Sequence, residues 1–104
     1  PAQYDRSIRA FAMALQSILV RAGDALPAER LVVELEVDGE YLEIVLDNRP
    51  SVTARISIDA DARARISSSG IADVLAGRDS DASRFTHVSG KEIATNHLDT
   101  ALRW

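Results

Sequence analysis

The feature that most constrains the fold of this chain is a segment in which apolar residues recur at every second position. Apolar side chains occupy every odd position from 31 to 37 and every even position from 42 to 46. Alternation of this kind is the period of a β-strand that buries one face. Asp38-Gly39 separates the two segments, and this dipeptide favours a two-residue hairpin turn. The sequence therefore predicts an antiparallel hairpin with one apolar face, which other elements must cover.

Three further segments are predicted to be strands. Asn48-Arg49-Pro50 favours a turn after the hairpin, and Asp59-Ala60-Asp61 separates the next two strands. The inward residues of these two strands are expected to be Val52, Ala54, Ile56 and Ile58 in the first, and Ala62, Ala64 and Ile66 in the second. Phe85–Val88 is predicted to be the last strand. The first four strands then form an antiparallel meander.

Helical periodicity marks the two ends of the chain. Apolar residues recur in steps of three and four from Tyr4 to Ala22, and Gly23 follows as a helix stop. The final helix is expected to run to about Arg103. Ser89-Gly90-Lys91-Glu92 matches a capping box, with Ser89 as the N-cap and Glu92 at the third helical position.

Between the fourth and fifth strands a short helix is predicted over Gly70–Ala76. The preceding serines, 67–69, can cap its N-terminus, and Gly77 ends it. Ser80–Arg84 is predicted to form a second brief turn or helix. The whole pattern favours a single α+β domain over residues 1–104, an antiparallel sheet of about five strands with helices packed on one face.

Composition excludes several classes of function. The 104 residues contain no cysteine, so disulfides, thiolate catalysis, cysteine-bound zinc and iron–sulfur clusters are excluded. The net charge of -4 comes without a basic stripe, which argues against nucleic-acid binding. No apolar run is long enough for a membrane span, and no secretory signal pattern opens the sequence. The cytoplasm is the expected compartment.

Charges of opposite sign alternate with the apolar residues of the strands. Glu34, Glu36 and Glu43 belong to the hairpin, and Arg55, Arg63 and Arg65 belong to the next two strands. We expect these residues to pair across strands on a solvated sheet face. An arginine patch for an anionic ligand is the less favoured alternative. Because Glu34 and Glu36 are expected to share this solvent face, nothing there is predicted to raise a carboxyl pKa.

Three segments together resemble the sterol carrier protein 2-like (sterol-binding, lipid-transfer) domain family. They are the alternating strand Asp61–Ser67, the short helix Ile71–Arg78 that ends in Gly-Arg, and Val88-Ser89-Gly90, which ends the last strand. The hairpin at Asp38-Gly39 and the N-terminal helix also fit the family's order of elements. The last strand departs from the family pattern, because the leading Gly and the trailing Asp of that pattern are missing from Arg84–Lys91.

The resemblance implies a hydrophobic cavity between sheet and helices that holds a fatty acyl chain, a sterol or a similar apolar molecule. Such a site would remove the ligand's apolar surface from water. The alternative for each residue is ordinary packing in the core of a short chain. The candidate ligand-binding residues are Phe11, Leu15, Leu35, Leu42, Ile44, Ile56, Val74, Leu75, Leu98 and Leu102.

Neither catalysis nor a metal site is favoured, and no cofactor is expected. His87 and His97 lack any known metal-ligand spacing, and His97 falls on the apolar face of the final helix, where it should be at least half-buried. The serines at 67–69 lack the Gly-x-Ser-x-Gly pattern of a nucleophile elbow. Pro1 is the exception, because tautomerase-superfamily enzymes use an N-terminal proline as catalytic base. Those chains begin a strand at the proline, whereas a helix is expected here.

The hypothesis favoured by the sequence is a non-catalytic lipid-binding or lipid-transfer domain. Two alternatives stay open beside it. Open strand edges and a terminal aromatic residue, Trp104, would suit a structural module that binds a protein partner or forms a homodimer. The second alternative is a tautomerase-like enzyme that depends on Pro1.

Overall fold

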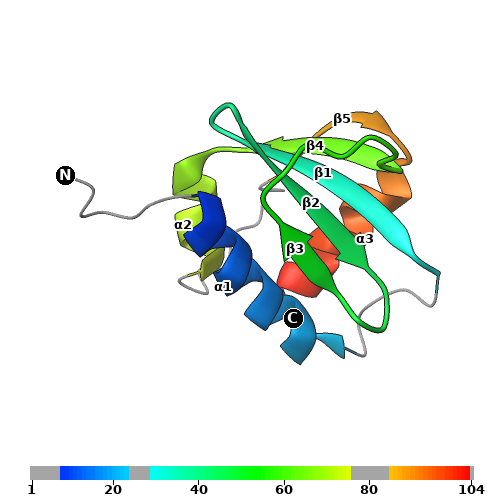
Figure 1. The fold of residues 1–104 in the computed structure, drawn as a ribbon, viewed down its shortest axis with the longest axis horizontal. Helices are drawn as coiled ribbons and strands as arrows, with labels where there is room; N and C mark the ends of the chain where they lie inside the picture. Colours follow the sequence, from blue (N-terminus) through cyan, green and yellow to red (C-terminus); the bar gives the residue numbers. More distant parts are fainter. Residues whose placement is uncertain (1–7, 24–28, 76–84, 104) are drawn as a thin grey trace.

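The computed structural model describes residues 8–23, 29–75 and 85–103 (Figure 1). These residues form three helices and five strands, four of the strands in succession. They are α1 (Ile8–Arg21), β1 (Leu31–Val37), β2 (Glu40–Leu46), β3 (Ser51–Thr53), β4 (Ala62–Ile66), α2 (Ser68–Leu75), β5 (Thr86–Gly90) and α3 (Glu92–Arg103). The α+β class predicted from the sequence is therefore confirmed. None of the helices in the described ranges is long and apolar enough to cross a membrane.

The five strands form one mixed sheet in the order β3-β2-β1-β4-β5. The hairpin of β1 and β2 is antiparallel as predicted, and its turn places Asp38 and Gly39 at φ values of 50° and 88°. Strand β4, however, pairs with β1 in parallel, with Leu35 opposite Ala64. The predicted antiparallel meander is therefore wrong at β4. The chain leaves the sheet after β3 and crosses to the far side of β1, so that β4 runs in the same direction as β1.

Strand β3 is shorter than predicted, because pairing with β2 ends at Thr53. The following loop, residues 54–60, reverses the expected orientation: Ile56 and Ile58 are 65% and 93% exposed, and Ser57 between them is buried. The prediction that both isoleucines point inward is therefore wrong. The reason is a backbone hydrogen bond, since the Ser57 N–H donates to Glu34 Oε2 at 2.8 Å and so turns this residue toward the sheet.

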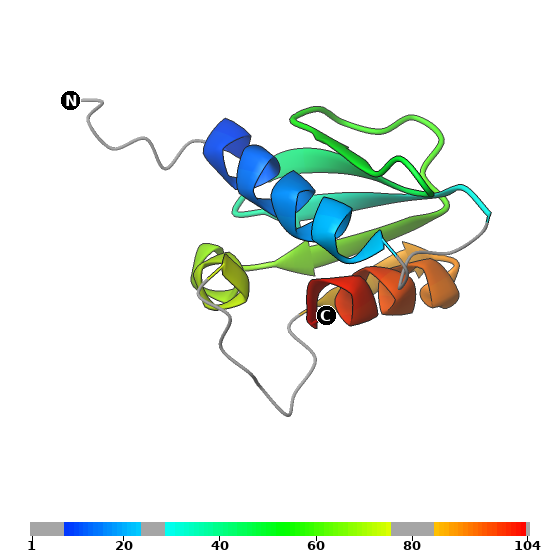
Figure 2. The same ribbon diagram turned by 90° about the horizontal axis from the view of Figure 1, so that it is seen from below.

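All three helices pack on one face of the sheet (Figure 2). The core lies between these two layers. Odd-numbered residues of β1 and even-numbered residues of β2 and β4 face it, as the period of two predicted. Helix α1 is the predicted N-terminal helix, although residues 4–7 of that prediction lie outside the described residues. One of the serines predicted to cap α2, Ser67, does so, because its Oγ accepts the Gly70 N–H at 3.0 Å, although the helix begins at Ser68 and not at Gly70. Gly77 and Ser80–Arg84 lie outside the described residues.

The end of β5 overturns the predicted capping box. Ser89 and Gly90 belong to β5, and α3 begins at Glu92, so Ser89 is not the N-cap and Glu92 is not the third helical residue. Lys91 takes the capping position, and its carbonyl accepts the Ala94 N–H at 3.0 Å. The strand continues to Gly90 because the next amide, that of Lys91, donates to the Asp61 carbonyl at 2.7 Å and fastens this end to the start of β4.

Candidate functional site

The apolar layer between sheet and helices contains most of the residues predicted to bind a ligand. Leu15, Leu35, Leu42, Ile44 and Leu98 are fully buried there, Val74 and Leu102 are buried in the same cluster, and Phe11 packs against it half-buried. These residues come from both helices and strands. Ile56 instead lies on the opposite side of the sheet and is exposed, and the side chain of Leu75 lies outside the described residues. That these residues bind a ligand stays a prediction.

In the described part of the chain, the charged residues that are buried lie outside this inner layer, although one carboxylate oxygen, Oδ1 of the half-buried Asp99 on α3, is buried too. The buried charged side chains there are Glu34 and Glu43, and both alternate with inward residues and so lie on the outer sheet face. The buried Thr95 hydroxyl is hydrogen-bonded to His87. An apolar molecule in the layer would therefore meet mainly hydrocarbon, which is the environment that favours its transfer from water.

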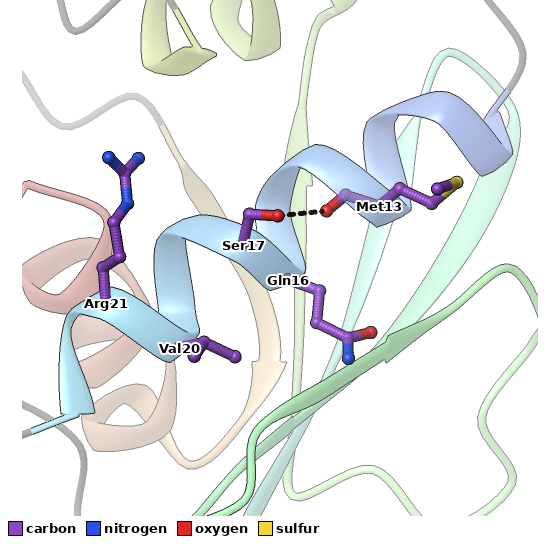
Figure 3. A pocket seen from close by; sticks show the side chains of 5 residues that line it. All are labelled: Met13, Gln16, Ser17, Val20 and Arg21. Atoms are coloured by element: carbon purple, nitrogen blue, oxygen red, sulfur yellow. Dashed lines mark hydrogen bonds between the residues drawn. The ribbon is translucent and has the colours of Figure 1, made fainter.

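A groove of about 530 Å³ runs along the exposed side of α1 (Figure 3). Its described lining consists of Met13, Gln16, Ser17, Val20 and Arg21, which recur at helical spacing along one face of α1. Gln16 reaches from this face to β3, where its Oε1 accepts the Val52 N–H at 3.4 Å. The groove therefore combines apolar side chains with an amide and a guanidinium at the junction of α1 and the edge strand.

None of the predicted ligand-binding residues is among the described residues that line this groove. The spacing of apolar residues in α1 predicts a single core face, and Met13 and Val20 fall outside that face. A signal was nonetheless present, because these two residues are seven apart and so share one face of a helix. Arg21 lies one position beyond Val20. An apolar pair on the otherwise polar side of a helix was the pattern that pointed to the groove.

The outer face of the sheet carries ion pairs between the charges that were predicted to pair. Two of them join strands, as predicted, whereas the third comes from Arg55, which lies in the loop after β3 and not on a strand. Arg63 Nε lies 3.2 Å from Glu34 Oε1, and Arg65 Nε lies 3.5 Å from Glu36 Oε1. Register explains both pairs, since Glu34 is opposite Arg63 and Glu36 is opposite Arg65 in the parallel pairing of β1 with β4. Glu43 on β2 is bound by Arg55 through both Nε, at 2.8 Å, and Nη2.

The expected solvation of this face is wrong for two of the glutamates. Glu34 and Glu43 are buried, because the loop 54–60 lies over them and supplies the Ser57 amide and the Arg55 guanidinium. The sequence could not reveal this cover, since alternation marks residues 34 and 43 only as belonging to the face away from the core. On the outer face, therefore, the carboxylates lie next to the sheet, and the guanidinium groups that bind them lie on the solvent side.

Acid should weaken the fold through Glu43. Hydrogen bonding from Arg55 is the largest cause that lowers the pKa of the Glu43 carboxyl below its ordinary value of 4.5. A carboxyl whose pKa is lowered by folding stabilises the protein above its unfolded pKa, and this contribution disappears as the pH falls through the lowered folded pKa. Thermal unfolding of the wild type should therefore lose stability over that acidic range more steeply than Glu43→Gln does. Parallel pH profiles for the two proteins would contradict the expectation.

The two histidines, His87 and His97, lie on β5 and α3. His87 connects β5 to α3, with Nδ1 2.9 Å from Thr95 Oγ1 and Nε2 3.2 Å from the Gly90 carbonyl oxygen. His97 is half-buried on α3, as expected. Within the described ranges, no cluster of three or more histidine, aspartate or glutamate side chains is placed to hold a metal ion. Pro1 and Trp104, on which the alternative hypotheses depend, lie outside those ranges.

Comparison with solved structures places the architecture in a known class, the sterol carrier protein 2-like fold. The chain is similar to a solved structure described as a UbiJ-SCP2 ubiquinone synthesis protein, with a TM-score of 0.59 over 91% of this chain and 87% of that one. The two sequences are 18% identical, so the likeness is one of fold. No protein-family model matches the sequence. No curated protein matches it either.

Proposed function

We propose that this chain is a non-catalytic lipid-binding domain. It holds a fatty acyl chain, a sterol-like molecule or another apolar lipid between the sheet and the helices. The observation that carries the proposal is the sterol carrier protein 2-like fold, which extends over 91% of the chain. The apolar inner layer supports it, because the two charged residues that are buried in the described ranges, Glu34 and Glu43, lie on the other face of the sheet.

The solved structure suggests which lipids to test. Its description names ubiquinone synthesis, so an isoprenoid quinone is a reasonable candidate beside the fatty acyl and sterol-like molecules that the sequence suggested. All three share a long apolar body with a small polar end. A layer made of Leu, Ile, Val and Phe side chains selects for the body by excluding water from it, and discriminates poorly between bodies of similar width.

Ligand capture is the direct test. Native mass spectrometry of the purified chain, followed by organic extraction, should detect a bound lipid. Addition of ubiquinone, palmitate or ergosterol to delipidated protein should raise the unfolding temperature for at least one of them. A ligand present at a hundred times its Kd stabilises the folded state by about 2.7 kcal/mol. For a domain of this size that corresponds to a rise of roughly 10 °C or more.

Two variants locate the bound lipid. Phe11→Ala opens the inner layer at its edge, whereas Val20→Ser changes the groove on α1 and leaves the inner layer intact. Loss of the ligand-induced rise in Phe11→Ala alone supports the inner layer. Loss in Val20→Ser alone moves the site to the groove. No bound lipid and no rise, together with self-association in light scattering, would replace the proposal with the structural module considered above.

A further inference from the structure

The loop 54–60 has an unusual distribution of polar and apolar groups. Two of its polar groups are bound to the sheet, since the Arg55 guanidinium binds Glu43 and the Ser57 amide donates to Glu34. The two isoleucines on either side of Ser57 are the most solvent-exposed parts of the loop's apolar surface. Figure 2 shows the loop over the sheet face opposite the helices. The loop is thus bound to the outer face of the sheet, while Ile56 and Ile58 project into solvent.

Arginine dominates the exposed charge around this loop. The side chains of Arg55, Arg63 and Arg65 are 64%, 44% and 58% exposed, whereas the glutamates with which they pair are 10%, 8% and 29% exposed. Each guanidinium therefore lies between its carboxylate and the solvent. The pairs of Arg63 and Arg65 run through Nε, and a guanidinium has further N–H donors that can bind a second anion.

The three arginines lie 2.5 to 3.5 Å from their partner glutamates, so the three pairs together carry no net charge, and the attraction of an anion depends on the guanidinium groups lying nearer to the solvent. At physiological ionic strength, charges more than about 8 Å apart in water are largely screened, so an approaching surface senses the nearest groups first. The exposed acidic residue closest in sequence to the isoleucines is Asp59, which follows Ile58. Its carboxylate opposes the attraction that the three arginines provide, which makes it a useful site for a test.

We propose that the outer sheet face and the loop 54–60 dock on an anionic phospholipid surface. Ile56 and Ile58 insert among the lipid headgroups, and the guanidinium groups of Arg55, Arg63 and Arg65 bind the phosphates. A lipid surface fits better than a protein partner, because the apolar element is a projecting loop on a charged face rather than a groove or a continuous apolar strip. Each arginine near an anionic membrane adds to the attraction.

Vesicle binding tests the proposal. The 104-residue chain is sedimented with vesicles of phosphatidylcholine alone, and with vesicles of equal parts phosphatidylcholine and phosphatidylglycerol. Binding is expected only to the second kind, and it should weaken as salt is added, because salt screens the arginines. Equal binding to both kinds, or binding to neither, would overturn the proposal.

Matched variants identify the surface. Ile56→Ser with Ile58→Ser should reduce binding to the anionic vesicles at least about tenfold, because insertion of both side chains is lost. Val88→Ser with Ile93→Ser removes another exposed apolar pair, 50% and 60% exposed, from β5 and α3 and should leave binding unchanged. Asp59→Asn should strengthen binding. Unfolding temperatures of all three proteins show that each is folded, since every substituted side chain is exposed.

Two results would assign the loop a different role. Undiminished vesicle binding by the isoleucine variant contradicts insertion. A wild-type dimer in light scattering that the isoleucine variant alone loses, without vesicle binding, shows that the loop joins two copies of the chain. The experiment is independent of the proposed internal ligand, because docking is read on vesicles and ligand capture is read in their absence. Either idea can therefore fail alone.

Discussion

Gly90→Ala is expected to destabilise the fold by roughly 3 kcal/mol or more, a large part of the stability of a domain of this size. Gly90 has φ of +84°, where a side chain is strained, and a Cβ there would overlap the Asp61 carbonyl oxygen and lie 2.8 Å from Ala62 Cα. Both neighbours are backbone atoms and cannot rotate away. Relief would require β4 and β5 to separate, which would break the hydrogen bond from the Lys91 amide to Asp61. Urea unfolding measures the loss.

Gly39→Ala is the matched control for this prediction. Gly39 has nearly the same backbone conformation, with φ of +88°, but a Cβ there would have no heavy atom within 4 Å. Its substitution should therefore cost only the backbone strain, about 1 kcal/mol. The difference between the two variants isolates the steric contact with Asp61. Equal losses would show that the close approach of β5 to β4 contributes nothing to the cost.

The contact between Gly90 and the Asp61 backbone also explains the role of two residues on which the family resemblance rests. Asp61 opens the first matched segment and Gly90 closes the last one, and no pattern in the sequence connects the two residues. In the structure they are neighbours, because Gly90 lies against the Asp61 backbone. Asp61 also accepts the Val32 amide through Oδ2 at 2.8 Å. The two motif residues thus hold β1, β4 and β5 together at one end of the sheet, which is a structural role rather than a ligand-binding one.

Local patterns predicted local structure well. The hairpin followed from alternation and Asp38-Gly39, and the cap of α2 followed from the serines before it, because both depend on residues close in sequence. The crossover from β3 to β4 could not be predicted in this way. It depends on Ser57 reaching Glu34, 23 positions earlier, and alternation in the intervening segment equally favours a longer β3. The predicted capping box is wrong for a similar reason, because the Asp61 carbonyl accepts the Lys91 amide across the sheet and keeps the preceding residues in β5.

The residues of the candidate site were also predicted well where local periodicity decides their position, and poorly where distant contacts decide it. The spacing of apolar residues alone predicts that Leu15, Leu35 and Leu98 lie in the inner layer, and the structure confirms that position. Period cannot distinguish a residue that lines a ligand site from one that packs the core, because both face inward with the same spacing. Ile56 was misplaced for a different reason: its orientation depends on how the loop is held over the outer face. Measurement on the inner layer itself is needed to separate packing from binding.

Leu35→Ala provides that measurement, with an expected loss of about 3 to 5 kcal/mol. Leu35 is fully buried in the central strand, between Leu42 on β2 and Ala64 on β4. Because Ala64 is small, its side chain cannot extend into the space that the substitution opens. A hole therefore remains, and its cost adds to the lost burial of the leucine side chain. Val45→Ala, on the half-buried outer side of β2, should cost about 1 kcal/mol or less and serves as the control.

Benzene then distinguishes a packed interior from one with room for a ligand. An enclosed apolar hole left by a truncated leucine stays dry and can take up benzene. Benzene should therefore raise the unfolding temperature of Leu35→Ala and leave Val45→Ala at the wild-type response. If the inner layer already admits apolar molecules, as the proposed function requires, benzene should stabilise the wild type as well. A response confined to Leu35→Ala would mean that the natural inner layer is filled by its own side chains, and the lipid would then have to bind elsewhere, with the groove on α1 as the next site to test.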